Sequence, residues 1–196
     1  MNIRSRMTGA ALAMLLLRAP WTCALAADLP PLSHSLTTQA PRPAPTLRLK
    51  DLGGTAHDLA QLKGRVVLVN FWATWCPPCR REMPSMERLS QALKGEAFSV
   101  LAVDVGENGD TIDAFASQLD TAPSFPILLD TRSRVMQAWK VAGLPTTFLI
   151  DRQGRIVASA IGGREFDHPR WSRRSVDCLK SSQTLTQTWP ASTFTS

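Results

Sequence analysis

Residues 66–79, VVLVNFWATWCPPC, decide the fold because they deliver two cysteines from an apolar run to the start of a helix. The run at residues 66–73 is nearly continuous in apolar side chains, which is typical of a central strand covered on both faces. Cys76 and Cys79 follow it, and an amphipathic segment begins with them. The order predicts a strand, a short loop and a helix whose first turn contains both sulfurs.

The Cys-x-x-Cys spacing at a helix N-terminus indicates a redox pair. The two sulfurs lie close enough to bond, and the positive end of the helix dipole favours the first one as a thiolate. We therefore expect Cys76 to be the exposed nucleophile and Cys79 the resolving thiol one turn along the helix.

Two other interpretations of the cysteine pair are less favourable. A structural zinc site needs two more ligands at a matching spacing, and the three histidines and Cys178 are isolated in the sequence. A purely structural disulfide that closes so small a loop removes little entropy from the unfolded chain and would stabilise weakly. The strand before the pair and the helix after it favour the redox interpretation.

The helix that begins at Cys76 is predicted to run to about residue 94. Glu82 shares its apolar stripe with Met86 and Leu89, and Cys79 lies three residues before Glu82 on the same side. A carboxylate there either reaches the edge of the stripe or is partly buried with its pKa raised. Beside a redox cysteine, we favour the raised pKa.

The rest of the pattern alternates strands with helices and predicts an α/β fold with parallel strands and helices on both faces of the sheet. We expect a small N-terminal hairpin, and a second hairpin closes the domain. The expected elements are strands at residues 97–103 and 125–129, helices at residues 111–119 and 133–141, and hairpins at residues 46–58 and 146–161.

Four regions are expected along the chain. Residues 1–27 combine arginines, an apolar run and small residues at a cleavage site, which is typical of an export signal. Residues 28–45 contain five prolines and few apolar anchors, and they predict a tether. Residues 46–168 form the domain. Residues 169–196 predict a poorly structured tail, since nine of the last sixteen residues are Ser or Thr.

The net charge of +6 does not indicate a nucleic-acid partner, because it lies at the two ends of the chain. Residues 1–43 and 169–196 each carry four basic side chains and one acidic one, and the 14 basic and 14 acidic residues between them cancel. We expect a monomer that binds no nucleic acid. Export would place it in the periplasm, either free or anchored in the membrane by an uncleaved signal.

Two longer stretches carry a family resemblance. Residues 67–84 (VLVNFWATWCPPCRREMP) and 143–154 (GLPTTFLIDRQG) resemble the TlpA/ResA-like exported thiol:disulfide oxidoreductases, a group in the thioredoxin superfamily that includes cytochrome c maturation proteins. The resemblance covers roughly residues 44–169. It implies a thioredoxin-like α/β fold with a central mixed sheet, an N-terminal β-hairpin and an inserted helix-strand unit at residues 109–129.

The resemblance also implies roles for residues of the motif. Cys76 matches the attacking cysteine of the family, Cys79 the resolving one, and Glu82 the carboxylate that tunes them. Asn70 stands where cytosolic thioredoxins carry a buried aspartate, so Glu82 is left as the nearby proton acceptor.

A second set of residues is implied to bind the substrate. In the family, a cis proline packs opposite the sulfurs, and the loop before it offers backbone groups to an extended substrate segment. Pro145 matches that proline, and Leu144 and Trp75 are expected to contact the substrate beside it.

The implied function is an exported thiol:disulfide oxidoreductase that reduces protein disulfides through a Cys76/Cys79 cycle, with cytochrome c maturation as a candidate setting. It would use no cofactor and no metal. Its implied partners are disulfide-containing protein substrates and a membrane thiol reductant of the DsbD type, since a dithiol outside the cytoplasm stays reduced only when electrons are supplied.

Two further functions remain as alternatives. A metal-handling thioredoxin-like module would resemble copper-delivery relatives, which use Cys-x-x-x-Cys and a distant histidine; this chain has two intervening residues and no histidine beside Leu144. A thiol peroxidase would share the fold, but such enzymes usually place a lone cysteine in a Pro/Thr-rich loop.

Overall fold

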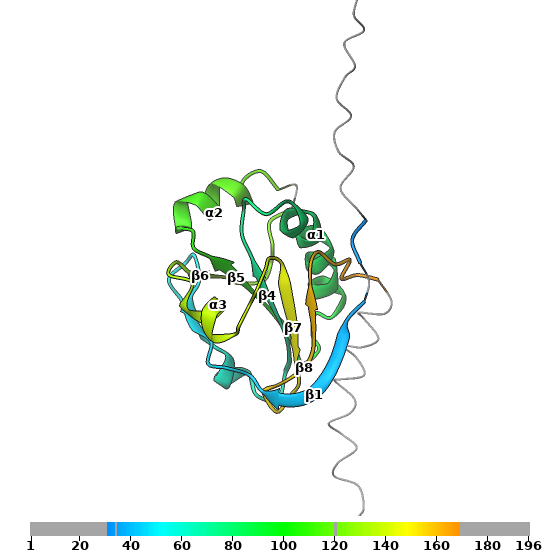
Figure 1. The fold of residues 1–196 in the computed structure, drawn as a ribbon. Helices are drawn as coiled ribbons and strands as arrows, with labels where there is room; N and C mark the ends of the chain where they lie inside the picture. Colours follow the sequence, from blue (N-terminus) through cyan, green and yellow to red (C-terminus); the bar gives the residue numbers. More distant parts are fainter. Residues whose placement is uncertain (1–30, 34, 120, 169–196) are drawn as a thin grey trace, which may run out of the picture. The chain divides into compact units, whose positions relative to one another are not determined.

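The computed structural model describes residues 31–33, 35–119 and 121–168, and a six-stranded mixed sheet forms their centre (Figure 1). The strand order is β1-β8-β7-β4-β5-β6, with β4, β5 and β6 parallel and the other neighbouring pairs antiparallel. A separate two-stranded sheet joins β2 to β3. The elements are β1 Thr37–Pro43, β2 Arg48–Lys50, β3 Ala56–Asp58, the 3-10 helix η1 Leu59–Leu62, β4 Val66–Trp72, α1 Pro77–Ala92, β5 Phe98–Val105, α2 Gly109–Ala116, β6 Ile127–Asp130, α3 Arg134–Ala138, β7 Thr146–Ile150 and β8 Arg155–Ile161.

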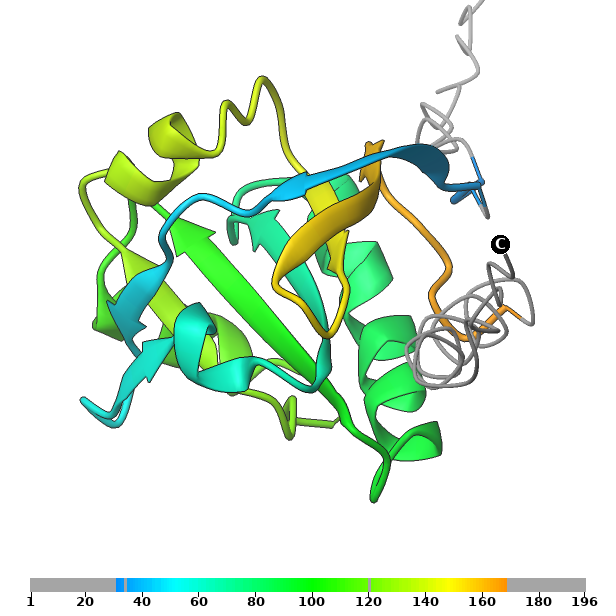
Figure 2. The ribbon, with the colours of Figure 1, turned by 90° about the horizontal axis from the view of Figure 1, so that it is seen from below.

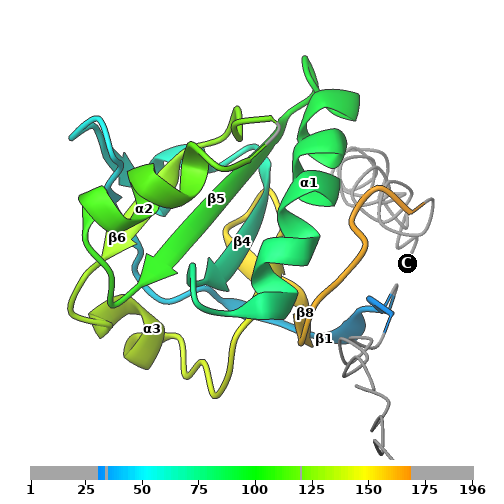
Figure 3. The same ribbon diagram turned by 90° about the horizontal axis from the view of Figure 1, so that it is seen from above.

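Strand β4 is the centre of the core, and all seven of its residues are buried. Successive side chains point to opposite faces. Leu68 therefore joins the apolar cluster of α1 and α2, which lie over one face of the sheet (Figure 3), and Val69 joins the cluster on the other face, against which α3 packs. Because Asn70 has the parity of Leu68, its amide enters the α1 face.

The architecture confirms the α/β fold and the mixed sheet predicted from the sequence. The β2–β3 pair is the expected N-terminal hairpin, and α2 with β6 forms the helix-strand unit expected near residues 109–129. The closing hairpin has the predicted bounds. Within the described residues, no helix has the length and apolar character needed to cross a bilayer.

Some element ends differ from the predictions for local reasons. Helix α2 begins at Gly109 rather than residue 111, because the Asn108 side chain accepts a hydrogen bond from the Thr111 amide at 2.9 Å and caps the first turn. Helix α3 is shorter than expected, since Ser133 and Lys140 adopt positive φ angles of 54° and 55° at its two ends.

The prediction of a tether is wrong for part of residues 28–45. Residues 37–43 form β1, which pairs antiparallel with β8 at the edge of the sheet (Figure 2). An edge strand has a neighbour on one side only, so it tolerates the prolines that suggested a tether. A register shift between Thr38 and Arg42 accommodates them. The domain therefore begins before residue 46. The predicted export signal and the Ser/Thr-rich tail lie outside the described residues.

Trp139 fills the core on the α3 face and provides a test of the packing. Its side chain is 2% exposed, and its ring lies 5.5 Å from that of Phe71 and 5.1 Å from that of Phe148. We expect Trp139→Ala to lower the free energy of unfolding by about 3 to 5 kcal/mol, because it leaves a large cavity. Urea unfolding with the disulfide intact measures this change.

Trp75→Ala is the matched control, because Trp75 is 67% exposed. It should change the free energy of unfolding by less than about 0.5 kcal/mol. Equal effects of the two substitutions would contradict the packing described for Trp139.

Candidate active site

Both cysteines lie at the first turn of α1 and are joined by a disulfide. Cys76 is the N-cap residue, Cys79 follows in the first turn, and their Cα atoms are 5.3 Å apart. Cys76 is 3% exposed and Cys79 is fully buried. Cys76 is thus the more accessible of the two but less exposed than expected, because in the disulfide form both residues belong to the apolar cluster beneath α1.

Two prolines fill the first two positions of α1. Pro77 and Pro78 lack a backbone N–H, so the first helical amide that can face the Cys76 sulfur is that of Cys79. A helix N-terminus usually offers several such donors to an anion. The start of α1 therefore gives a Cys76 thiolate the helix dipole but few hydrogen bonds.

Glu82 lies fully buried on α1, one turn after Cys79. Its Oε1 accepts a hydrogen bond from Asn70 Nδ2 at 2.7 Å, and its Oε2 accepts one from the Arg164 backbone N–H at 2.9 Å. Burial raises the pKa of Glu82 to about 8, although both hydrogen bonds and the positive charge of Arg164 act to lower it. The prediction of a buried carboxyl with a raised pKa is confirmed.

Asn70 connects Glu82 to the sheet. Its Nδ2 also donates to Thr147 Oγ1 at 3.0 Å, and the two residues face each other across the antiparallel β4–β7 pair. Thr147 was not predicted as a site residue, because it lies 77 residues from Asn70 along the chain. The amide holds Glu82 in place and cannot take up a proton at neutral pH.

The loop that enters β7 contains the predicted cis proline. The peptide bond between Leu144 and Pro145 is cis, as the family resemblance implied. The Pro145 carbonyl accepts a hydrogen bond from the Gly162 amide at 2.8 Å, and the Thr146 hydroxyl donates to the Gly143 carbonyl at 2.6 Å. Leu144 packs against the apolar cluster that contains both cysteines.

Two large apolar side chains are exposed among the described residues. Trp75, next to Cys76, is 67% exposed, and Ile161, at the end of β8, is 64% exposed. Ile161 pairs with Thr146, the residue after Pro145. Trp75 was predicted to contact the substrate and Ile161 was not, although the alternation along β8 places Ile161 on its outward side.

A second group of acidic residues, not predicted from the sequence, lies next to the loop before Cys76. The Glu107 carboxylate accepts hydrogen bonds from the Thr74 amide and the Thr74 hydroxyl, both at 2.6 Å. Burial, and then the neighbouring Glu107, raise the pKa of Asp104 to about 8. No local pattern could have found this contact, because 33 residues separate Thr74 from Glu107.

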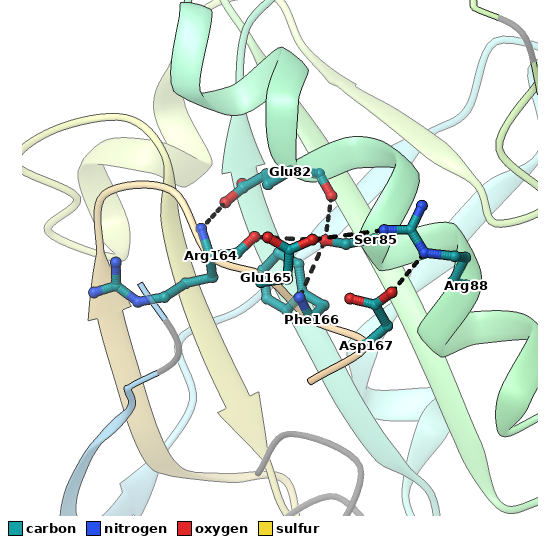
Figure 4. Close-up of polar contacts among 7 residues, drawn as sticks. All are labelled: Glu82, Ser85, Arg88, Arg164, Glu165, Phe166 and Asp167. Atoms are coloured by element: carbon teal, nitrogen blue, oxygen red, sulfur yellow. Dashed lines mark hydrogen bonds and ion pairs between the residues drawn. The ribbon is translucent and has the colours of Figure 1, made fainter. Parts of the chain in front are cut away.

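The segment after β8 covers the buried carboxyl of Glu82. Residues 164–167 lie along α1, and Figure 4 shows their backbone meeting Glu82 and Ser85. Arg164 was not predicted as a site residue. Its contact with Glu82 is made by the backbone N–H, so residue type alone could not reveal it.

The described part of the chain contains no group of three or more His, Cys, Asp or Glu residues arranged to hold a metal ion.

Comparisons with known proteins agree with this geometry. The Redoxin family matches residues 39–170. The chain is 43% identical over 113 residues to "Thiol-disulfide oxidoreductase ResA" of Geobacillus kaustophilus, covering 58% of this chain and 64% of the relative. It is 39% identical over 119 residues to the ResA of Bacillus subtilis, covering 61% and 65%. The matches thus span less than two thirds of those relatives' length.

Solved structures share the fold. A thiol:disulfide interchange protein of the thioredoxin family from Chlorobium tepidum superposes with a TM-score of 0.59 at 27% identity, covering 73% of this chain and 97% of that one. StoA from Bacillus subtilis superposes with a TM-score of 0.57 at 23% identity, covering 66% and 97%. The fold is thioredoxin-like.

The raised pKa of Glu82 predicts a dependence of stability on pH. The folded protein holds this proton up to about pH 8, whereas the unfolded chain releases it near 4.5. The stabilising contribution of the protonated form is therefore complete below pH 4.5 and is lost as the pH rises to about 8. Urea unfolding at pH 5 and pH 8 should show a smaller loss for Glu82→Gln than for the wild type, by on the order of a few kcal/mol.

Glu96→Gln is the control for this measurement, because Glu96 is an exposed glutamate. Its stability should follow the wild-type curve across the same pH range. Parallel curves for Glu82→Gln and the wild type would show that Glu82 ionises normally in the folded protein.

Proposed function

We propose that this chain, which belongs to the Redoxin family, is a thiol:disulfide oxidoreductase that reduces disulfides in protein substrates. The observation that carries the proposal is the disulfide between Cys76 and Cys79 at the first turn of α1, with the buried carboxyl of Glu82 one turn further along. A bonded pair of cysteines at this position can store and release two electrons, and a carboxyl with a pKa of about 8 can exchange a proton near neutral pH.

The proposed cycle begins with the reduced protein. The Cys76 thiolate attacks one sulfur of a substrate disulfide, forms a mixed disulfide and releases the other substrate sulfur as a thiolate. Cys79 then gives its proton to the Glu82 carboxylate and attacks the Cys76 sulfur. The second substrate sulfur leaves as a thiolate and becomes protonated. The substrate has gained two electrons, and Cys76 and Cys79 are again joined.

The substrate surface is proposed to surround the accessible side of Cys76. Trp75, next to Cys76, and Ile161, which pairs with the residue after Pro145, offer exposed apolar area. Leu144 and Pro145 would also contact the substrate. An extended segment of the substrate would pair with the backbone beside the cis Pro145, as a strand adds to a sheet edge.

The cell compartment and the electron donor are part of the proposal. The features of residues 1–27 support export to the periplasm, where a dithiol needs a supply of electrons. A membrane thiol reductant of the DsbD type would restore the reduced state, and the protein would act as a monomer. The resemblance to TlpA/ResA-like proteins supports cytochrome c maturation as the setting.

The proposal favours reduction over oxidation of the substrate. Pro77 and Pro78 supply neither a cation nor an N–H to a Cys76 thiolate, so the reduced form gains little extra stability. The spacing of Cys76 and Cys79, with two residues between them, allows the disulfide. This spacing also argues against the metal-handling and peroxidase alternatives.

A trapping experiment tests the cycle. Cys79→Ala should accumulate mixed disulfides with substrate proteins, because the resolving attack is lost while the attack by Cys76 remains. Cys76→Ser should trap none and should lose turnover of insulin disulfides. Non-reducing gels of cells that carry each variant report the mixed disulfides, and an insulin reduction assay of each purified variant reports the turnover. Equal trapping by the two variants would refute the assignment of Cys76 as the nucleophile.

The reduction potential tests the direction of the reaction. Equilibration with glutathione should give a value nearer the roughly −270 mV of thioredoxin than the roughly −120 mV of DsbA. A value above about −180 mV, typical of an isomerase, would instead indicate an oxidase or isomerase.

A further inference from the structure

The guanidinium of Arg164 is bound to backbone carbonyls on two separate segments. Three of these carbonyls belong to the turn that Arg164 itself ends: Ile161 at 2.8 Å, Gly162 at 3.0 Å and Gly163 at 2.9 Å. The fourth is Ser35, whose carbonyl accepts from Arg164 Nε at 2.9 Å. One planar side chain therefore fixes the turn after β8 and ties it to the residues before β1.

The residues before β1 pair with this turn. We call residues 31–33 and 35–36 the arm, and residues 162–167 the cover. The Ser33 amide donates to the Gly163 carbonyl at 3.1 Å, and the Glu165 amide donates to the Ser33 carbonyl at 3.0 Å. Ser33 of the arm and Arg164 of the cover form an isolated parallel bridge.

Gly163 lies between the arm and the Cys-Pro-Pro-Cys motif. A Cβ at this position would lie 2.6 Å from Leu32 Cδ2 and 3.2 Å from Pro78 Cβ. A side chain at this position would displace Leu32 and push against Pro78, so glycine allows the cover to approach the start of α1 closely. The arm thus presses the cover against the helix that carries the redox pair.

The cover continues along α1 from the site outward, as Figure 4 shows. The Arg164 amide donates to Glu82, and the Phe166 amide donates to Ser85 Oγ at 3.0 Å. Arg88 then forms ion pairs with Glu165 and Asp167. Each contact lies about one helical turn after the previous one, so the cover shields Glu82 from water along that side of the helix.

We propose that Arg164 is a positioning residue that, together with the arm, keeps the cover closed over Glu82 and so sets how strongly that carboxyl holds its proton. The role of this proton in thiol exchange rests on the proposed function above. The shielding itself does not, because it belongs to the disulfide form described here.

The groups around Glu82 make it possible to distinguish shielding by the cover from a simple effect of charge on the Glu82 pKa. Asn70 on β4 and Thr147 on β7 are neutral, and Cys79 on α1 is held in the disulfide. Among the described residues, Arg164 is the charged group that acts on Glu82, and its positive charge lowers the pKa of the carboxyl. Loss of that charge, or of the Arg164 N–H bond, would by itself raise the pKa of Glu82. Opening the cover to water would instead lower the pKa, because burial is the largest cause of the shift.

The test follows the Glu82 carboxyl directly by NMR titration of the oxidised protein with carbon-13-labelled glutamate, with the Glu82→Gln spectrum assigning the signal. Arg164→Lys keeps the charge but cannot reach four carbonyls with one planar group. We expect the pKa of Glu82 to fall from about 8 by roughly one unit or more in Arg164→Lys, and also in Arg164→Ala. An unchanged value in Arg164→Lys, or a raised value in Arg164→Ala, would overturn the proposal.

Arg65→Lys is the matched control. Arg65 also binds backbone carbonyls, those of Glu96 and Phe98, but at the start of β4 and β5. It should leave the Glu82 titration unchanged. A shift equal to that of Arg164→Lys would mean that loss of any clamping arginine loosens the fold, and would overturn the specific role of Arg164.

Ser33→Pro tests the arm without touching Arg164. Proline removes the amide that donates to Gly163, and the pKa of Glu82 should again fall. An unchanged pKa would remove the arm from the proposal. Every titration uses the disulfide form, so its result does not depend on whether the same samples reduce insulin. A protein without reductase activity can therefore still support or refute the proposed role of the cover.

Discussion

The hydrogen bond from Asn70 to Glu82 joins the strand that precedes the disulfide to the helix that follows it. Both residues are fully buried, so each would be costly to bury without the other. The bond fixes the rotation of α1 relative to β4, and with it the position of Cys79 one turn before Glu82. The chemistry proposed for the sulfurs depends on this single contact between sheet and helix.

Strand β4 has a buried carboxyl on each of two neighbouring elements. Glu82 on α1 accepts a hydrogen bond from Asn70, and Asp104 pairs with Trp72 near the end of β5, where the carboxylate of Glu107 binds the loop before Cys76. Burial raises the pKa of Glu82 and of Asp104 to about 8. Two carboxyls that hold protons near neutral pH reduce the stability of the fold when they ionise.

The sheet edge and the site are connected by hydrogen bonds. Strand β1 pairs with β8, the arm before β1 pairs with the cover after β8, and the cover donates to Glu82. Residues near the start of the described chain are therefore connected to Glu82 by two steps: backbone hydrogen bonds join the arm to the cover, and the Arg164 N–H joins the cover to the carboxylate. A segment rich in proline can pair in this way because each proline still offers its carbonyl oxygen, and an edge strand needs partners on one side only.

The sequence by itself determined the central strand, the helix with Cys76 and Cys79, the stripe position of Glu82 and the closing hairpin, because these follow from local periodicity and spacing. Only the tertiary structure decided that residues 37–43 form an edge strand, and that Thr147, Glu107 and the backbone N–H of Arg164 belong to the site. Such contacts join backbone groups and side chains that lie 33 to 82 residues apart. Their partners are chosen by the register of the sheet and the path of the chain, which no local pattern encodes.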